Sequence, residues 1–284
     1  MKIFYTTLVL ACLLSANTIE AQMPRNNLDE YSENEYSIYA TVGASNFQHS
    51  PAKGGETKGS LGFGGGLAYI CNVSSRLGIS LGLELSSFRG ETFYKSLQET
   101  YEAIDNQGTR MEYIYSIDNY REKQNMMLLS LPVMMRVIIP TGNRAGVYLA
   151  GGIKFGFPVV SKAKISGENI TSTGYYKEEH IPYSKLPEHG FFSGQSISDE
   201  KSNIRGFTTM TTFSVETGMR FALEKKALYA GVYFDYCPNS PNLSKNTHPL
   251  NYFGNISYKS VLNSSLSSKP NLMSVGLKVQ FSMF

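Results

Sequence analysis

The strongest constraint on the fold of this chain is an alternation of apolar residues with small or polar ones at every second position. Between residues 77 and 86, every odd-numbered position holds Leu or Ile, and the even-numbered positions hold Gly, Ser and Glu. Successive side chains of a β-strand point to opposite faces, so this stretch predicts a strand with one apolar face and one polar face.

The same alternation recurs in seven further segments. They are 37–43, 63–69, 129–137, 147–155, 213–221, 228–235 and 274–281. Each lies in a stretch long enough for the roughly 9 to 11 residues that a tilted strand needs to cross a bilayer, and their total is even. Charged residues make up only 17% of the chain, against about 25% in an ordinary soluble domain. The sequence therefore predicts an all-β fold, an eight-stranded antiparallel up-and-down transmembrane β-barrel.

The connections between these segments alternate in length. The short ones are 73–76, 140–145 and 224–226, and the long polar ones are 49–60, 95–122, 159–205 and 239–270. Short periplasmic turns alternating with long extracellular loops are typical of outer-membrane barrels. We therefore expect both ends of the barrel to be periplasmic.

The first residues have the parts of a secretory signal. Lys2 precedes an apolar run over 3–14, and a polar stretch ends at Ala21 before Gln22. This pattern predicts a signal peptide over 1–21, cleaved after Ala21. A periplasmic N-terminal lead-in over 22–35 and an outer-membrane β-barrel domain over 36–284 would then follow. The alternative, a lipoprotein modified at Cys12, would leave an apolar core too short for export.

The remaining bulk features exclude several classes. Past residue 21 no window holds 18 uninterrupted apolar residues, which argues against a helical membrane protein. The net charge of +3 comes from interspersed residues without a basic tract, so we expect no nucleic-acid partner. Cys71 and Cys237 fall near opposite ends of the predicted barrel, so we expect no disulfide between them.

All charged residues in the predicted membrane portions occupy the polar face. They are Glu84, Arg136, Lys154, Glu216, Arg220, Asp235 and Lys278. A Lys or Arg turned to lipid at the midplane would cost roughly 2 to 4 kcal/mol, so the two faces are well determined. Because buried charges must be paired, we expect these seven residues to form a structural ion-pair network that fills the lumen. The alternative is a gated or narrow pore.

The last strand resembles the insertion signal that the outer-membrane barrel-insertion machinery reads on its substrates. The resemblance covers Ser274, Gly276, Val279, Phe281 and the final Phe284. With the signal peptide and the strand series, the region 36–284 resembles the small Gram-negative outer-membrane β-barrel superfamily, which includes the OmpA transmembrane domain, OmpX and the PorT-like barrels.

The stretch 129–136 is similar to the Leu-Glu-Ile-Pro-Leu-Leu-Leu-Lys stretch of the PorT-like group, with Ser130 in place of its Glu. Pro132 cannot donate to a neighbouring strand, which predicts a local bulge.

Residues capable of chemistry fall in the predicted loops. His49 and Ser50 are the only pair that suggests a lipid A deacylase, an alternative that lacks an acidic partner to orient the histidine. Glu178-Glu179-His180 with Glu188-His189 could ligate a metal, but charged residues are the default in a polar loop, so we expect these residues to be part of a solvated loop. We predict no catalytic, cofactor-binding or metal-binding residue, and no cofactor.

The sequence thus favours a non-enzymatic outer-membrane barrel whose long loops act as a binding, adhesion or envelope-structural surface. Loop 159–205 is the leading candidate because it carries Tyr175, Tyr176, Tyr183, Phe191 and Phe192, which we expect to fold over the barrel mouth or to meet a partner. The expected partners are outer-membrane lipid and lipopolysaccharide, the insertion machinery, and a surface or envelope protein. A PorT-like component of a secretion or transport assembly, or a narrow pore, is the alternative.

Overall fold

The structure is a computed structural model that describes residues 34–284 apart from 53, 106, 143, 179, 224, 239–242, 244, 246, 254 and 269. The predicted signal peptide, its cleavage site and residues 22–33 of the lead-in lie outside the described residues.

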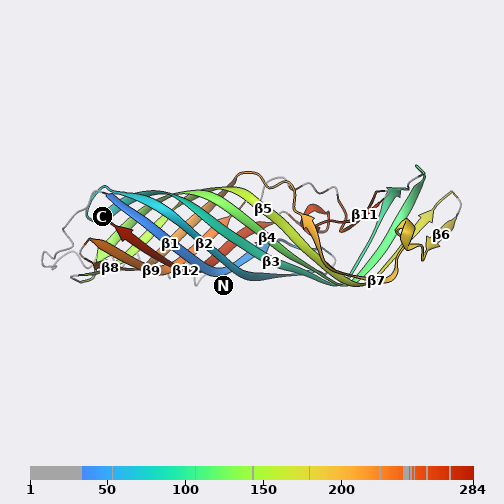
Figure 1. Cartoon of the computed structure of the whole chain (residues 1–284), viewed down its shortest axis with the longest axis horizontal. Helices are drawn as coiled ribbons and strands as arrows, with labels where there is room; N and C mark the ends of the chain where they lie inside the picture. Colours follow the sequence, from blue (N-terminus) through green and yellow to red (C-terminus); the bar gives the residue numbers. More distant parts are fainter. Residues whose placement is uncertain are drawn as a thin grey trace.

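Eight strands form a closed antiparallel ring (Figure 1). They are β1 (Asn34–Gln48), β2 (Glu56–Asn72), β3 (Leu77–Ile104), β4 (Arg110–Pro140), β5 (Ala145–Tyr176), β8 (Met210–Leu223), β9 (Lys226–Cys237) and β12 (Asn271–Met283). Consecutive barrel strands pair with each other, and pairing of β1 with β12 closes the ring. All eight alternating segments lie within these strands, so the predicted barrel and its strand number are confirmed.

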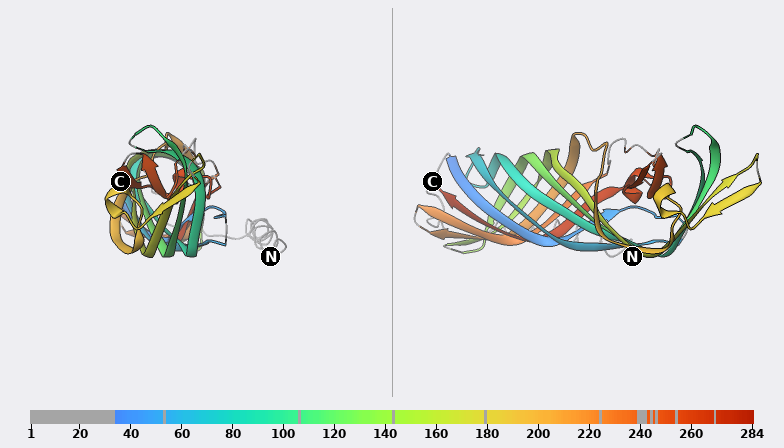
Figure 2. Two further views of the ribbon diagram at one scale, coloured as in Figure 1. Left: turned by 90° about the vertical axis from the view of Figure 1, so that its right-hand side faces the viewer. Right: turned by 45° about the vertical axis from the view of Figure 1, so that its right-hand side comes forward.

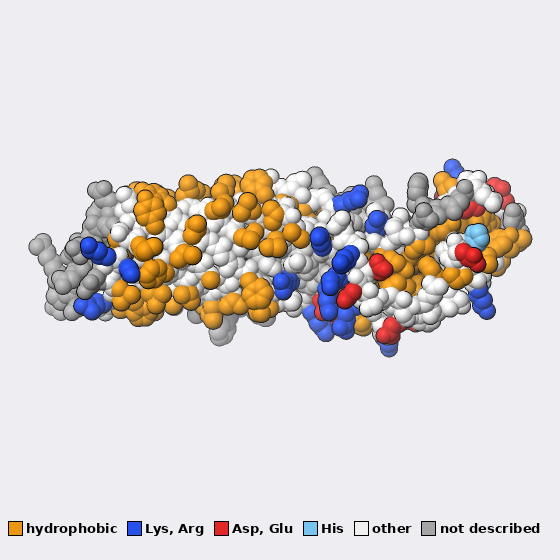
Figure 3. Space-filling view, in the orientation of Figure 1, with side chains coloured by type: hydrophobic (Ala, Val, Ile, Leu, Met, Phe, Trp, Pro, Cys, Tyr) orange, Lys and Arg blue, Asp and Glu red, His pale blue; other side chains and the backbone are white. Residues whose placement is uncertain are grey.

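The two faces of the barrel are those that the alternation predicts. In the part of β3 that lies in the ring, Ile79, Leu81, Leu83 and Leu85 point outward, as do Leu67 and Leu277, which are 59% and 60% exposed. Figure 3 shows hydrophobic side chains spread over the barrel on the face in view. An outer surface this apolar is suited to lipid, with a barrel that pairs its backbone groups internally. None of the described helices is long and apolar enough to cross a membrane.

The two ends of the barrel differ greatly. One end, here called the turn end, holds the short connections after β2, β4 and β8, together with the start of β1 and the final Phe284. The strands β3, β4 and β5 have total lengths of 28, 31 and 32 residues. At the other end of the barrel they extend beyond the ring as a curved sheet, here called the arm (Figure 2). Two shorter strands, β6 (Ile181–Ser184) and β7 (Ser193–Asn203), pair with β5 in this arm.

The arm corrects the expectation of polar loops at 95–122 and 159–205. Residues 95–104 and 110–122 form one continuous hairpin, which ends at the pair Ile104–Arg110. The alternation in fact continues there, because Met111, Tyr113, Tyr115 and Ile117 are buried while positions 112, 114 and 116 are more exposed. Polar side chains on the solvent face made this stretch resemble a loop.

The arm has a core of its own, built largely from tyrosines. Its buried members include Tyr94, Tyr113, Tyr115, Tyr120, Phe191 and Tyr252, and the partly buried Tyr101 packs against them. The ring centroids of Tyr113 and Tyr252 lie 5.1 Å apart. The cluster is closed by a small hairpin of β10 (Leu250–Phe253) and β11 (Asn255–Tyr258) and by Phe191, which follows the exposed 3-10 turn η3 (Pro187–His189). Of the aromatics of loop 159–205, Tyr176, Tyr183, Phe191 and Phe192 therefore serve the arm's own packing.

The predicted bulge at Pro132 is wrong in position. Pro132 pairs with Lys154 of β5, and the register between β3 and β4 is the same on both sides of it. A Cβ on Gly82 would meet Pro132 Cγ at 3.2 Å, so this glycine makes room for the proline ring. The register shift of β4 against β5 that is nearest to Pro132 lies between Met127 and Leu128.

Candidate functional site

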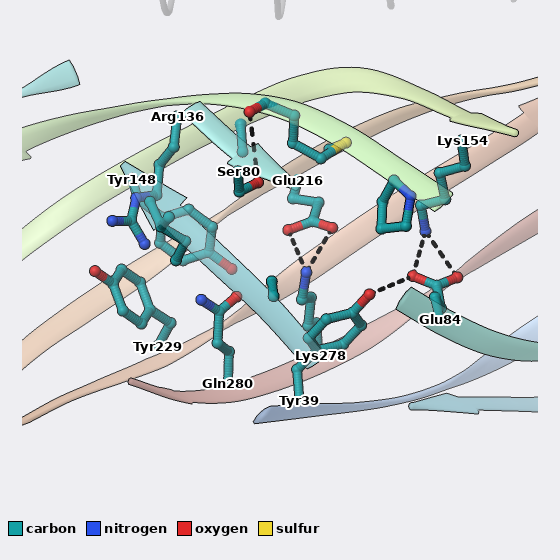
Figure 4. Close-up of a pocket in the computed structure, with 15 residues that line it drawn as sticks. Tyr39, Ser80, Glu84, Arg136, Tyr148, Lys154, Glu216, Tyr229, Lys278 and Gln280 are labelled. Carbon is teal, nitrogen blue, oxygen red and sulfur yellow. Dashed lines mark hydrogen bonds and ion pairs between the residues drawn. The ribbon is translucent and has the colours of Figure 1, made fainter. Parts of the chain in front are cut away.

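The centre of the lumen is occupied by an ion triad that joins three strands. Lys154 Nζ on β5 lies 2.9 Å from Glu84 Oε2 on β3, a pair drawn in Figure 4, and 2.9 Å from Asp235 Oδ2 on β9. All three side chains are almost completely buried. The two carboxylates thus share one ammonium group. Their attraction to it compensates part of the free-energy cost of removing three charges from water.

A second ion pair lies beside this triad. Lys278 Nζ on β12 is 2.7 Å from Glu216 Oε1 on β8. The same ammonium lies 4.1 Å from the ring centroid of Tyr39, whose hydroxyl donates to Glu84 Oε2 at 2.9 Å. Tyr39 therefore links the pair to the triad, and Figure 4 shows these side chains pointing toward one another.

A third group lies toward the turn end, and sequence reasoning missed one of its members. Arg136 Nη2 on β4 is 2.8 Å from Glu35 Oε1 on β1. The Tyr229 hydroxyl donates to Glu35 at 3.2 Å and accepts from Arg220 Nε at 3.1 Å. Glu35 was placed in the lead-in, but it shares the odd parity of Ser37 and Tyr39, and this signal could have assigned it to the lumen.

The lumen is electrically balanced and nearly full. With Glu35 it holds four carboxylates against the four cations Arg136, Lys154, Arg220 and Lys278, and only Arg220 is more than slightly exposed. The cavity among these side chains has a volume of about 30 Å³, which is about the share of one molecule in liquid water. The seven predicted residues thus all line the lumen, and a filled interior suits them better than a pore.

The residues of the predicted insertion signal lie along the strand that closes the ring. Gly276 is opposite Gly43 of β1, and Phe281 is opposite Ile38. Val279 faces outward, Ser274 faces the lumen, and Phe284 follows β12 with its ring 5.9 Å from the guanidinium carbon of Arg220. Their role in insertion stays a prediction.

Residues 260–268, here called the mouth segment, fold into the arm end of the barrel. Val261 and Leu262 are fully buried in the 3-10 turn η4 (Val261–Asn263), and Leu266 is nearly so. Glu122 of β4 holds this turn by accepting from Ser260 Oγ and from the Val261 N–H.

Glu122 also accepts from the Tyr120 hydroxyl at 2.7 Å and from Gln124 Nε2 at 3.2 Å. Burial raises the pKa of its carboxyl above the ordinary value, although these donors oppose the shift. The segment is held from its other side by Lys245, whose ammonium donates to the backbone oxygens of Leu262, Ser267 and Ser268.

His49 does not lie at the outer rim, where a lipid A deacylase would need it. Its ring is buried within the arm end, with Nδ1 3.1 Å from Phe47 O and Nε2 3.3 Å from Thr92 Oγ1. Burial lowers the pKa of His49 to about 4, so the ring is neutral at ordinary pH. Ser50 is exposed and its backbone N–H binds Ser268 Oγ, so the two residues do not form a nucleophile and base.

The other predicted loop residues are dispersed. Glu178, His180, Glu188 and His189 are exposed near the tip of the arm, and no metal-binding group of His, Cys, Asp or Glu occurs among the residues that the structure describes. Glu179 lies outside the described residues. Cys71 and Cys237 lie at opposite ends of the barrel, so no disulfide joins them to each other.

Comparisons with known proteins give structural likenesses alone. No protein-family model and no curated protein matches the chain. The outer membrane protein OprG from Pseudomonas aeruginosa is 10% identical, with a TM-score of 0.36, over 88% of this chain and 97% of its own. Neisserial surface protein A is 11% identical, with a TM-score of 0.34, over 86% and 95%.

The attachment invasion locus protein Ail of Yersinia pestis is 12% identical, with a TM-score of 0.33, over 89% of this chain and all of its own. These proteins are small outer-membrane β-barrels, as this chain was expected to be. The fold assignment itself rests on the closed strand pairing and the apolar outer surface described above.

Proposed function

We propose that this chain is a non-enzymatic surface protein of the outer membrane, in which a closed barrel anchors a rigid β-arm outside the cell. The observation that carries the proposal is the length of β3, β4 and β5, which is 28, 31 and 32 residues. About 9 to 11 residues are enough to cross the bilayer. About two thirds of each strand is therefore available for a structure beyond the membrane.

The filled lumen supports a role outside the barrel. Lys154 and Lys278 are each bound to carboxylates from other strands, so opening a path would separate buried ion pairs. Such a separation leaves charges uncompensated in a medium of low dielectric constant. Transport through this barrel is disfavoured for that reason, which also argues against the narrow-pore alternative.

The arm has the properties of a binding platform. Its tyrosine core makes it rigid, and its outer face carries an open hollow of about 680 Å³ between β3, β4 and β5. Gln98, Thr100, Ser116 and Thr173 give this hollow hydroxyl and amide groups, with Ile114 as an exposed apolar side chain. Such a mixed surface suits adhesion to, or recognition of, a protein of the envelope or of another cell.

The orientation follows the general architecture of such barrels. Short turns face the periplasm and long connections face outward, so the turn end would be periplasmic. The final strand, with its terminal Phe284, would then be presented to the insertion machinery from that side.

A photocrosslinking residue placed at Thr100 or Ile114 tests the proposal in living cells. We expect crosslinks to a partner protein from these arm positions and none from Leu83 or Val133, which face lipid on the same two strands. Protease added to intact cells should also cleave at the arm tip, 105–109, while periplasmic proteins stay intact. Protection of the tip would contradict the outward orientation.

A component of a secretion or transport assembly is the second candidate. Pairing of β2 with β3 ends at Glu56–Phe93, so residues 94–104 of β3 form an edge along the arm. An edge strand offers backbone donors and acceptors to a strand of another protein. Crosslinks from Leu83 or Val133 to other integral membrane proteins would favour this candidate over adhesion.

A further inference from the structure

The outer surface carries a row of cations where the arm leaves the apolar band. Strand register places Lys58, Glu91, Lys123, Lys164 and Lys201 side by side across β2, β3, β4, β5 and β7. One step nearer the apolar band, Arg89, Asn125 and Lys162 are likewise opposite one another. The six cations of these two rows are exposed, and we call them the basic patch. Figure 3 shows Lys and Arg side chains gathered beyond the end of the apolar band.

The chain does not neutralise this patch itself. The carboxylate of Glu91 is bound to Arg121 at 3.0 Å, outside the two rows. Lys164 reaches Asp199 only at 3.9 Å, and both side chains are more than half exposed. Lys123 and Lys201 form no ion pair within the part of the chain that the structure describes.

Like charges directly opposite each other destabilise a sheet. Lys123, Lys164 and Lys201 are three such neighbours in succession. A row of this kind is best explained by a negative group that comes from outside the chain.

The patch lies at the height of lipid headgroups. The guanidinium carbon of Arg89 is 5.3 Å from the ring centroid of Phe63, which faces lipid. Val159, 55% exposed, precedes Lys162 by three residues, a rise of about 10 Å along the strand. The headgroup layer next to the hydrocarbon core is of similar thickness. The cations thus begin where the apolar surface ends.

The patch is hollowed and one-sided. Five of the cations, Arg89, Lys123, Lys162, Lys164 and Lys201, line a depression of about 640 Å³ together with Gln124, Asn125 and one carboxylate, that of Glu91. On the other half of the ring, the charged residues of β1, β8, β9 and β12 lie in the lumen or at the turn end. A general attraction to the membrane surface would need no such asymmetry.

We propose that the basic patch binds the phosphate groups of a phosphorylated glycolipid of the outer leaflet, with its acyl chains against the apolar face of β3, β4 and β5. Lysine ammonium groups bind phosphate oxygens as flexible point charges, and several of them suit a headgroup with more than one phosphate. The inference rests on the proposed outward orientation of the arm, but it requires no protein partner.

Native mass spectrometry of the full-length protein, folded in neutral detergent and titrated with bisphosphorylated lipid A, tests the inference. The test variant is Lys123→Gln/Lys162→Gln/Lys164→Gln/Lys201→Gln. Each basic residue near an anionic lipid surface contributes about five-fold to affinity, so the four changes together should weaken binding by about 100-fold or more. Folding of the variant is checked by its resistance to SDS before heating.

The matched control removes the same number of charges at the turn end. It is Arg76→Gln/Arg144→Gln/Lys225→Gln/Lys226→Gln, four exposed cations at the opposite edge of the barrel. We expect its affinity for lipid A to stay within about three-fold of the unmodified chain, because these charges lie more than a Debye length from the patch. Dephosphorylated lipid A should bind the unmodified chain as weakly as bisphosphorylated lipid A binds the test variant.

Three outcomes would overturn the inference. The first is equal lipid A binding by the test variant and the unmodified chain. The second is displacement of lipid A by inorganic phosphate at equal concentration, which would make the patch a site for free phosphate. The third is binding of a sulfated polysaccharide such as heparin without binding of lipid A. Absence of protein crosslinks from the arm would contradict the proposed adhesion role, but it would not change the expected binding of lipid A.

Discussion

Glu35 and Arg136 are 101 residues apart in the chain, and their side chains meet at 2.8 Å across the lumen. This contact ties β1 to the end of β4, close to the turn that connects β4 with β5. It also completes the balance of four acids and four bases, which the seven residues recognised from the alternation lacked.

Glu35→Ala should therefore destabilise the barrel. Arg136 would lose its carboxylate partner in a buried position, and removal of one member of a buried pair typically costs about 3 to 5 kcal/mol. Urea unfolding in phospholipid vesicles measures the free energy of unfolding. The control Glu56→Ala removes an exposed carboxylate at the start of β2. An equal effect of both variants would mean that the Glu35–Arg136 pair contributes nothing specific.

Lys154→Met should have an effect at least as large. Glu84 and Asp235 would both be left buried without their shared ammonium. We expect a loss of about 3 to 5 kcal/mol in unfolding free energy, by the same measurement. Lys162→Met, an exposed lysine on the same strand, should change it by about 0.5 kcal/mol or less. The triple variant Lys154→Met/Glu84→Gln/Asp235→Asn should recover part of the loss, and no recovery would argue against the ion triad as the cause.

The refolded protein should show no stable unitary conductance in planar bilayers. Ion pairs from five strands fill the lumen, and the remaining cavity of about 30 Å³ is far smaller than a continuous water column. Lys278→Ala/Glu216→Ala should raise the frequency of brief openings. Long-lived channels in the unmodified protein would favour the narrow-pore alternative.

Lowering the pH should loosen the arm end through His49. Its pKa in the folded protein is about 4, below the ordinary value of 6.5. The neutral ring therefore stabilises the folded state above pH 6.5, and this contribution is lost as the pH falls toward 4. A shift of this size corresponds to about 3 kcal/mol. Unfolding curves between pH 7 and pH 4 should show the loss, and His49→Gln should reduce it. The exposed His189, changed to Gln, serves as the control.

Glu122→Ala should release the mouth segment without unfolding the barrel. The variant would leave the Tyr120 and Ser260 hydroxyls and the Val261 N–H without their acceptor, each at a cost of about 1 to 3 kcal/mol. Trypsin should then cleave after Lys259 at least about ten times faster, because cleavage follows the population of the locally open form. Unchanged cleavage, with the barrel still resistant to SDS, would show that other contacts hold the segment.

The barrel could be predicted from the sequence because lipid imposes a strict rule on every membrane strand. A single side chain such as Lys154 or Glu84 turned outward would be costly, so the alternation itself records which face is which. Strand number, the three short turns and the lumenal side of all seven charged residues followed from that pattern.

Tertiary structure alone decided what happens beyond the membrane. A position that faces water can hold a polar or, at modest cost, an apolar side chain. Residues 95–122 and 159–203 therefore carry no pattern as strict as that of a membrane strand, and their polar face concealed a sheet with a tyrosine core. The same holds for contacts between distant strands. Local alternation does not encode barrel closure or strand register. These two features decide which residues pair with Lys154 and Glu35, and they bury His49. They also align Lys123 with Lys164 and Lys201.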